Sequence, residues 1–222
     1  MGHGTTPRGE VTDLDSRSAP RVGRDRPAGR GELDSKAVGV HLVGMMASVF
    51  IGTSLDGFIA RPDGSLDWLP ADGGEPHGYD EFIATVDAIV MGRKTFETVL
   101  TFDGWPFGKK PVVVLSSNPS ALRAPEGAVC EMMTGTPNEI VDRLAERGMK
   151  HLYVDGGVTI QGFLRAGLIQ RLIITRVPVI LGDGIPLFGP LSRDILLQHV
   201  ATRSYASGLV QSEYVVAAGG PE

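Results

Sequence analysis

The chain has 222 residues, of which 42% are hydrophobic and 21% are charged, and its formal net charge is −5. This length and composition are typical of a globular protein with one good core or two small ones. The negative charge argues against a general affinity for nucleic acids or anionic membranes, and the apolar runs are shorter than the roughly 18 residues of a membrane span. A single cysteine, Cys130, excludes an internal disulfide framework and a multi-cysteine zinc site, and it favours a reducing, cytoplasmic compartment.

Residues 1–44 differ in composition from the rest of the chain. They contain no Phe, Trp or Tyr, and they carry seven Lys or Arg against six Asp or Glu. Such a segment buries too little apolar surface to offset the entropy lost on ordering, and it has no apolar stretch of the signal-peptide type. We therefore expect a disordered extension over residues 1–44 and one folded domain over residues 45–222.

Strand and helix patterns alternate after residue 46. The expected strands lie at 47–55, 58–60, 88–92, 111–117 and 151–157, and the expected helices lie at 78–86, 94–100, 136–148 and 158–167. The third helix is the clearest, because Thr136 and Glu139 form a capping box, Pro137 suits the first turn and Gly148 ends the helix.

After residue 170 the helical patterns stop. Strands are expected at 171–181, 196–206 and 209–218, with a turn at 207–208 joining the last two. The whole pattern predicts an α/β fold, with a mainly parallel central sheet, antiparallel C-terminal strands and flanking helices.

The end of the strand at 88–92 carries groups that suit an anionic ligand. Gly92, Arg93, Lys94 and Thr95 stand where the strand gives way to a helix. Two cations and a hydroxyl near the N–H groups of a helix start can hold a phosphate monoester. The alternative is an ordinary solvated cationic loop.

The next strand ends in Leu115, Ser116 and Ser117, whose hydroxyls can bind a phosphate or a sugar. The alternative is a simple turn, since Asn118 and Pro119 follow. Sites in parallel sheets form at the carboxyl ends of the strands, so both ends are candidates for one site.

A third strand end has the sequence Asp155-Gly156-Gly157 and precedes a helix. Glycines let a ligand approach the backbone closely, so a pyrophosphate can reach the N–H groups of the residues that follow, Val158 and Thr159 among them. The alternative is a structural bend. Three such ends in succession favour a dinucleotide, which has several phosphates to bind.

Several longer motifs carry a resemblance to a known family. The segments "VMGRKTFET", "VVVLSSNP" and "LYVDGGVTIQGFL" occur in the order seen in the dihydrofolate reductase superfamily. The segments "TSLDGFIARPDGSLDWL" and "VPVILGDGIPLF" are similar to the branch that contains the reductase domain of riboflavin biosynthesis. The resemblance covers about residues 47–190, and it rests on the order and spacing of motifs that are individually weak.

The resemblance implies a reductase that binds NADPH. In the family, the arginine-containing loop binds the 2′-phosphate, the hydroxyl-bearing strand end flanks the adenosine, the glycine pair holds the pyrophosphate, and the first strand lies beside the nicotinamide. The residues at these four places are Gly92, Arg93, Lys94 and Thr95; Leu115, Ser116 and Ser117; Gly156, Gly157, Val158 and Thr159; and Thr53, Ser54 and Ile59. Arg93 favours NADPH over NADH on physical grounds too, because its guanidinium fork suits the extra phosphate.

Two carboxylates are candidates for the proton that accompanies hydride transfer. Asp56 lies near the expected nicotinamide site, although an Asp-Gly pair is also a favoured turn without any chemistry. Asp155 stands where the riboflavin reductase branch often has a glutamate near its substrate, and its alternative role is to cap the following helix. No metal site is expected, because the histidines lack metal-ligand spacing.

Departures from the family patterns limit the substrate. Asp72, Asp80 and Glu81 are the candidates for the carboxylate that binds a pterin in dihydrofolate reductases. Asp72 lacks the family's spacing, Asp80 and Glu81 lie on the expected helix, and none is assigned to this role. The segment "FIATVDAIV" has no Lys or Arg to bind a ribose phosphate. We therefore expect a reductase for a small pteridine-like, pyrimidine-like or carbonyl substrate. In the resembling branch the segment 177–188 lies near the dimer interface, so we expect a homodimer; the alternative is that this apolar segment is simply core. The alternative is a protein that binds NADPH without turnover, as a sensor or interaction partner.

Overall fold

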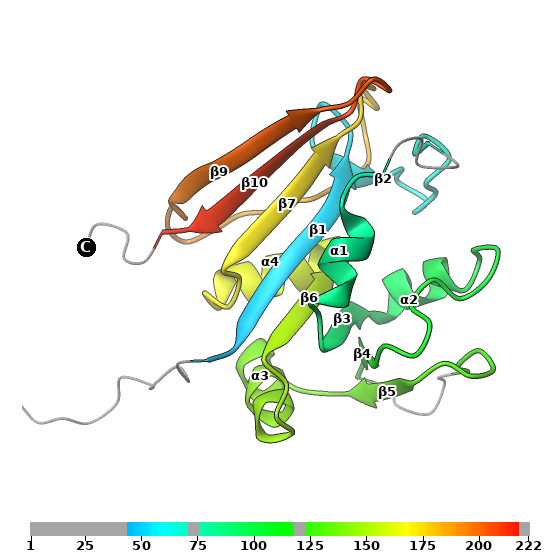
Figure 1. Ribbon diagram of the computed structural model, residues 1–222, viewed down its shortest axis with the longest axis vertical. Helices are drawn as coiled ribbons and strands as arrows, with labels where there is room; N and C mark the ends of the chain where they lie inside the picture. Colours follow the sequence, from blue (N-terminus) through cyan, green and yellow to red (C-terminus); the bar gives the residue numbers. More distant parts are fainter. Residues whose placement is uncertain (1–43, 71–75, 118–122, 218–222) are drawn as a thin grey trace, which may run out of the picture. The chain divides into compact units, whose positions relative to one another are not determined.

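The computed structural model describes residues 44–70, 76–117 and 123–217, and eight strands in these ranges form the central sheet (Figure 1). In chain order the strands are β1 (Met46–Thr53), β3 (Ala88–Gly92), β4 (Val112–Leu115), β5 (Cys130–Met133), β6 (His151–Asp155), β7 (Arg171–Arg176), β9 (Leu197–Ser204) and β10 (Val210–Val216). Across the sheet their order is β5-β4-β3-β6-β1-β7-β10-β9.

The sheet is parallel from β5 to β7, and its last two pairings, β7 with β10 and β10 with β9, are antiparallel. This confirms the predicted mixed α/β architecture. The predicted turn before β10 is present, since Tyr205 and Gly208 close it with backbone hydrogen bonds of 2.9 Å. Strand β5 was not predicted, because its sequence, Cys-Glu-Met-Met, lacks the β-branched residues that mark strands.

The strand predicted over 171–181 was wrong beyond Arg176. Pro178 has no N–H to donate to a ladder, and the chain leaves the sheet after Val177. A second, two-stranded sheet forms instead from β2 (Phe58–Ala60) and β8 (Ile185–Pro186), which run antiparallel. This small sheet brings the segment 177–187 against the loop that follows β1.

Helices cover both faces of the parallel part of the sheet. They are α1 (Tyr79–Ala84), α2 (Arg93–Val99), α3 (Pro137–Glu146) and α4 (Gly157–Arg165). The buried side chains of α1 and α2 belong to one apolar cluster, and those of α3 and α4 belong to the other. Figure 1 shows α1 in front of β1 and β6, with α4 behind the sheet.

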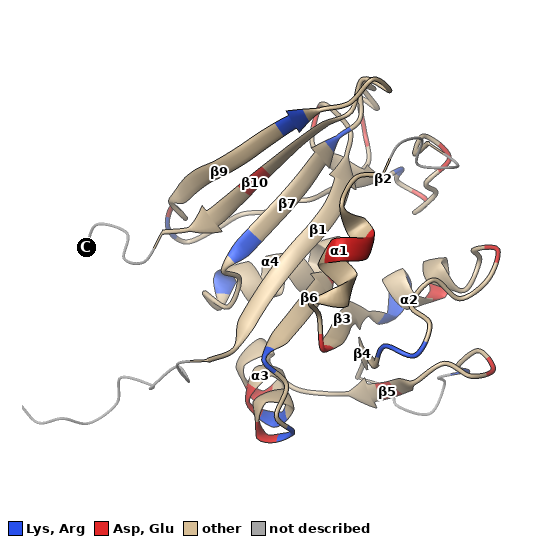
Figure 2. Ribbon diagram, in the orientation of Figure 1, with Lys and Arg blue, Asp and Glu red and all other residues tan. Residues whose placement is uncertain are grey.

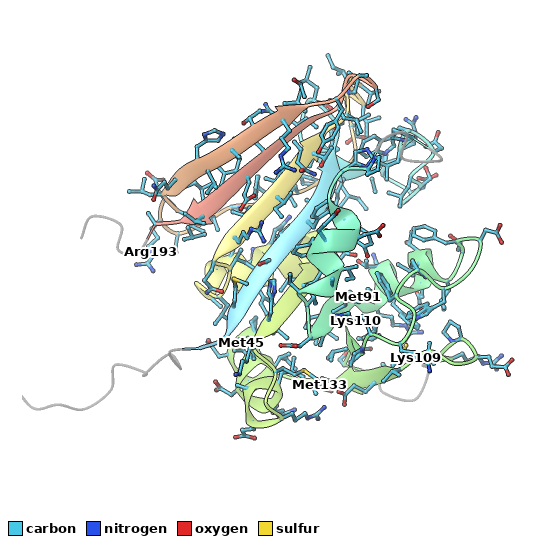
Figure 3. The ribbon with its side chains drawn as sticks, in the orientation of Figure 1. Met45, Met91, Lys109, Lys110, Met133 and Arg193 are labelled. Atoms are coloured by element: carbon cyan, nitrogen blue, oxygen red, sulfur yellow. The ribbon has the colours of Figure 1, made fainter. Side chains whose placement is uncertain are left out.

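Strand β3 reads as a continuous apolar run because helices cover both of its sides. Ala88 and Val90 pack in the cluster of α3 and α4, and Ile89 and Met91 pack in the cluster of α1 and α2. All four are fully buried. Figure 3 labels Met91, which lies on the α1 side near the carboxyl end of the strand.

Helix α3 begins with the predicted capping box. The Thr136 hydroxyl accepts the Glu139 N–H at 3.3 Å, and a Glu139 carboxylate oxygen accepts the Thr136 N–H at 2.8 Å. Both bonds satisfy N–H groups that a helix start otherwise leaves unpaired.

The expected disordered extension, residues 1–44, lies outside the described ranges except for Gly44. Within these ranges, every helix is too short or too polar to cross a membrane.

Candidate cofactor and substrate site

The three predicted anion-binding ends lie next to one another. Strands β4, β3 and β6 are neighbours and run parallel, so their carboxyl ends reach the same edge of the sheet. Gly92 pairs with Leu115 across one boundary, and Met91 pairs with Asp155 across the other. The topology therefore joins into one edge residues that are 23 positions apart in the sequence, Gly92 and Leu115, and 64 positions apart, Met91 and Asp155.

Glycines allow the β3–α2 and β6–α4 junctions to pack closely against each other. A Cβ atom built on Gly156 would overlap the Thr95 side chain, and a Cβ atom on Gly92 would lie 3.1 Å from Thr159 Oγ1. Each junction thus has a threonine hydroxyl against the glycine backbone of the other. Any larger residue at position 156 would push the two junctions apart.

The start of α4 presents backbone N–H groups without a side-chain cap. Gly156 is the N-cap, with φ +85° and ψ 135°, and the first turn of the helix contains no acidic residue. The N–H groups of the first turn have no partner within the helix. In contrast to α3, which is closed by its capping box, α4 can donate to an external anion.

Arg93 is the first residue of α2 and is partly exposed. Figure 2 shows both basic and acidic segments on α2. Its Nε donates to Glu97 Oε1 at 2.8 Å, and both side chains remain about half accessible to solvent. Exposed pairs of this kind contribute little stability, so Glu97 is a weak competitor for a phosphate. Lys94 follows and is exposed.

The two hydroxyl-bearing residues at the end of β4, Ser116 and Ser117, follow directly after the last residue of the strand. Strand β4 ends at Leu115, and the Ser116 N–H continues to the Met133 carbonyl at 3.1 Å. Thr134 Oγ1 donates to the Ser116 carbonyl at 3.2 Å, which ties this end to the end of β5. Ser117 follows and is exposed at the same edge of the sheet.

Strand β2, which follows the end of β1 along the chain, packs on the start of α4. Thr53 and Ser54 are buried, and Ser54 Oγ accepts the Phe58 N–H at 2.9 Å. A Cβ atom on Gly157 would lie 2.9 Å from Ile59 Cδ1, so β2 packs directly on the helix start.

Asp56 anchors one loop to another. Its carboxylate accepts the N–H groups of Gly182 at 2.7 Å and Leu181 at 3.2 Å. The hydrogen bond with Ser54, followed by those from the two backbone groups, holds the pKa of this exposed carboxyl below its usual value. These contacts favour the structural alternative for Asp56.

Replacing Asp56 with alanine is expected to loosen the 181–182 loop. The two N–H groups lose their acceptor, so their hydrogen exchange, measured by NMR or mass spectrometry, should become faster. Tyr205 N–H, which donates to the Leu209 carbonyl at 2.9 Å and not to this loop, serves as the internal reference. A loss of turnover with unchanged exchange at 181–182 would instead assign Asp56 to the chemistry.

Asp155 is a half-buried carboxyl at the end of β6, on the side of the sheet that α1 covers. Its Oδ1 accepts the N–H of Gly156 at 2.8 Å. Burial raises the pKa of Asp155 to about 6, against the lowering effect of hydrogen bonds from Gly156 and Tyr153. The carboxyl therefore holds its proton in the pH range where most aspartates have lost theirs.

Aromatic residues around Asp155 were not predicted from the sequence. Tyr153 is buried beside it, and the rings of Tyr79 and Phe82 lie 5.5 and 5.1 Å from the ring of Phe50. The signal was present, since His151, Tyr153 and Asp155 alternate along β6 and must share one face.

The proposed equivalents of a pterin-binding carboxylate do not reach this group. Asp80 and Glu81 lie in the first turn of α1 and are both exposed. Asp72 lies outside the described residues.

Comparison with known proteins supports the resemblance found in the sequence. Residues 47–211 match the RibD C-terminal domain family. The chain is 34% identical over 170 residues to the uncharacterized protein YwjB of Bacillus subtilis, a match that covers 75% of this chain and 95% of YwjB. A crystal structure from Shewanella sp. PV-4, assigned to riboflavin biosynthesis, is 39% identical with a TM-score of 0.71 and covers 78% of this chain and 100% of its own.

The fold is also shared with a more distant enzyme. Dihydrofolate reductase from Enterococcus faecalis, complexed with NADP(H), has a TM-score of 0.55 at 21% identity and covers 78% of this chain and 96% of its own. At this identity the likeness concerns the fold alone. Taken together, the family match, the relatives and the sheet order show that this chain belongs to the RibD C-terminal domain family, within the dihydrofolate-reductase-like reductases.

Proposed function

We propose that the chain is an NADPH-dependent reductase that transfers hydride to a C=N or C=O group of a small pteridine-like, pyrimidine-like or carbonyl substrate. The observation that carries the proposal is the adjacency of the ends of β4, β3 and β6, with uncapped N–H groups and a guanidinium on one edge. A dinucleotide needs several anion contacts along one line, and this edge supplies them.

Each part of the edge suits one part of NADPH. Arg93, with Lys94 and Thr95 beside it, would bind the 2′-phosphate, and the end of β4 would flank the adenosine. The first turn of α4 would bind the pyrophosphate, because Gly156 has no side chain to block it. The end of β1 and β2, whose Ile59 packs on the start of α4, would lie beside the nicotinamide.

Asp155 would supply the proton for the reduced group. When bound, the cofactor supplies the hydride, and the protein aligns the two reactants. A carboxyl with a pKa of about 6 still carries its proton at mildly acidic pH and can donate it to a nitrogen or oxygen. Turnover should therefore decrease as pH rises above about 6.

A homodimer remains our expectation for the assembled enzyme. The segment 177–188 carries two exposed apolar side chains, Ile180 and Phe188, which are 70% and 47% accessible. Exposed apolar side chains of this size suit a contact with a second copy of the chain.

Substituting Arg93 with alanine is expected to weaken the binding of NADPH by about 1–3 kcal/mol and to leave the binding of NADH nearly unchanged, because only NADPH has the 2′-phosphate. Titration of the purified protein with each cofactor, followed by fluorescence or calorimetry, measures both affinities. Arg165→Ala, which removes an exposed cation at the far end of α4, is the matched control. Glu97→Gln should increase the affinity for NADPH slightly, since it removes the anion paired with Arg93.

An equal loss of affinity for NADPH and NADH in Arg93→Ala would contradict the assignment of Arg93 to the 2′-phosphate. Tight NADPH binding without NADPH oxidation by any pterin, pyrimidine or carbonyl compound would favour the sensor instead of the enzyme.

A further inference from the structure

Tyr153 connects Asp155 to the backbone of β1. Tyr153 and Asp155 are two residues apart on β6, so their side chains lie on the same face of the sheet. The Tyr153 hydroxyl donates to the Phe50 carbonyl at 2.9 Å, and it also lies within hydrogen-bonding reach of the Asp155 carboxyl. The ring is 6% exposed and packs edge-on against Phe82 at 5.2 Å.

The Tyr153 hydroxyl has one proton to donate and two groups that can accept it, the Phe50 carbonyl and the Asp155 carboxylate. A phenol donates a single O–H, whereas an ionised carboxylate accepts only. A bond to an ionised oxygen is about twice as strong as one to a neutral carbonyl. The preferred acceptor of Tyr153 must therefore depend on whether Asp155 carries its proton.

We propose that Tyr153 is a positioning residue for Asp155, and that its hydroxyl donates to the Phe50 carbonyl while Asp155 is protonated and to the Asp155 carboxylate once that proton has left. This role rests on the proposed function. In the reductive step, the O–H bond of Asp155 breaks and its proton goes to the nitrogen or oxygen of the substrate. The carbon of the same group would gain the hydride that the bound cofactor supplies as it becomes oxidised, and a proton from solvent would later restore Asp155.

The surroundings of Asp155 leave Tyr153 as the partner that can respond. On α1, the pKa of Tyr79 is raised to about 12 by burial and then by the negative charges of Asp155 and Asp80. From β3, the residue paired with Asp155 is the apolar Met91. Tyr153, whose hydroxyl donates to the Phe50 carbonyl, is the neighbouring side chain whose hydrogen bonding lowers the pKa of Asp155.

The experiment is a carbon-13 NMR titration of the cofactor-free protein, with labelled aspartate and tyrosine. Asp155→Asn identifies the Asp155 carboxyl resonance. In Tyr153→Phe, the pH at the midpoint of the Asp155 titration should rise by roughly half a unit or more, because the carboxylate loses a hydrogen bond that favours its charged form. Tyr79→Phe, which keeps the ring and the burial, should leave the midpoint in place.

A second measurement needs no substitution of Tyr153. In the wild-type protein, the Cζ resonance of Tyr153 should shift with the same midpoint as the Asp155 carboxyl, since the hydroxyl changes its acceptor. An unchanged Asp155 midpoint in a folded Tyr153→Phe protein, or a Tyr153 resonance that ignores the Asp155 titration, would overturn the proposal.

The outcomes separate this inference from the proposed function. A shifted Asp155 titration midpoint in Tyr153→Phe, together with full turnover in Asp155→Asn, would support the role of Tyr153 and show that Asp155 takes no part in the chemistry. An unshifted midpoint together with lost turnover in Asp155→Asn would keep the catalytic role of Asp155 and reject the role of Tyr153.

Discussion

Gly156→Ala is expected to abolish NADPH binding and to destabilise the folded protein. The residue has φ +85° and ψ 135°. Residues other than glycine rarely adopt this backbone conformation, and strain of this kind costs about 1–3 kcal/mol. The new Cβ atom would also overlap the Thr95 side chain, so the β3–α2 and β6–α4 junctions would have to separate. Urea unfolding and NADPH titration measure the two effects.

The matched control is Gly167→Ala, just after α4. Gly167 also has positive φ, +69°, but its added Cβ atom would have no neighbour within 4 Å. We expect a loss of about 1–2 kcal/mol there from the backbone alone, with NADPH affinity unchanged. The double variant Gly156→Ala with Thr95→Ala should recover part of the lost stability. Wild-type NADPH affinity in Gly156→Ala would refute the close approach of the two junctions as a requirement for binding.

Asp155→Asn is expected to lower turnover by roughly 10²–10⁴-fold and, at neutral pH, to make the protein more stable. The raised pKa, about 6 against an ordinary 3.8, fixes the direction of the stability effect. Below about pH 4 the carboxyl is protonated in both the folded and unfolded states and the variant gains nothing. Between about pH 4 and 6 the unfolded state loses its proton first, so the wild-type protein loses stability as pH rises.

Above about pH 6 the loss is complete, and asparagine avoids it because it carries no charge. We expect a gain of about 1–3 kcal/mol near pH 7.5, a range that allows for the partial exposure of Asp155 to solvent. Urea unfolding of both proteins near pH 4 and pH 7.5 tests this, since contributions from other groups cancel in the difference. A stability difference that is the same at both pH values would show that Asp155 titrates normally.

The combination of these two effects identifies a residue kept for chemistry. A carboxyl that destabilises the fold at neutral pH has no structural reason to be there, whereas an acid that must hold its proton gains from burial. Asp56 is the opposite case, because its carboxylate stabilises a loop through two backbone N–H groups.

Local patterns in the sequence were sufficient for most of the secondary structure. The capping box at Thr136, the buried run of β3 and the turn at 207–208 depend on neighbouring residues, and the structure confirms all three. The predicted strand beyond Arg176 failed where Pro178 should have ended it, and β5 was missed because only its pairing with β4 makes it a strand.

The sequence by itself determined the order of strands and helices, the three anion-suited strand ends and the family, because these depend on residue type and spacing along the chain. Only the tertiary structure decided which ends meet, that Thr95 packs on Gly156, and that Asp155 is buried where it interacts with Tyr79 and Tyr153. The physical reason is that strand pairing and burial act between residues far apart in the chain. A carboxyl acquires its pKa from neighbours that the linear sequence does not place beside it.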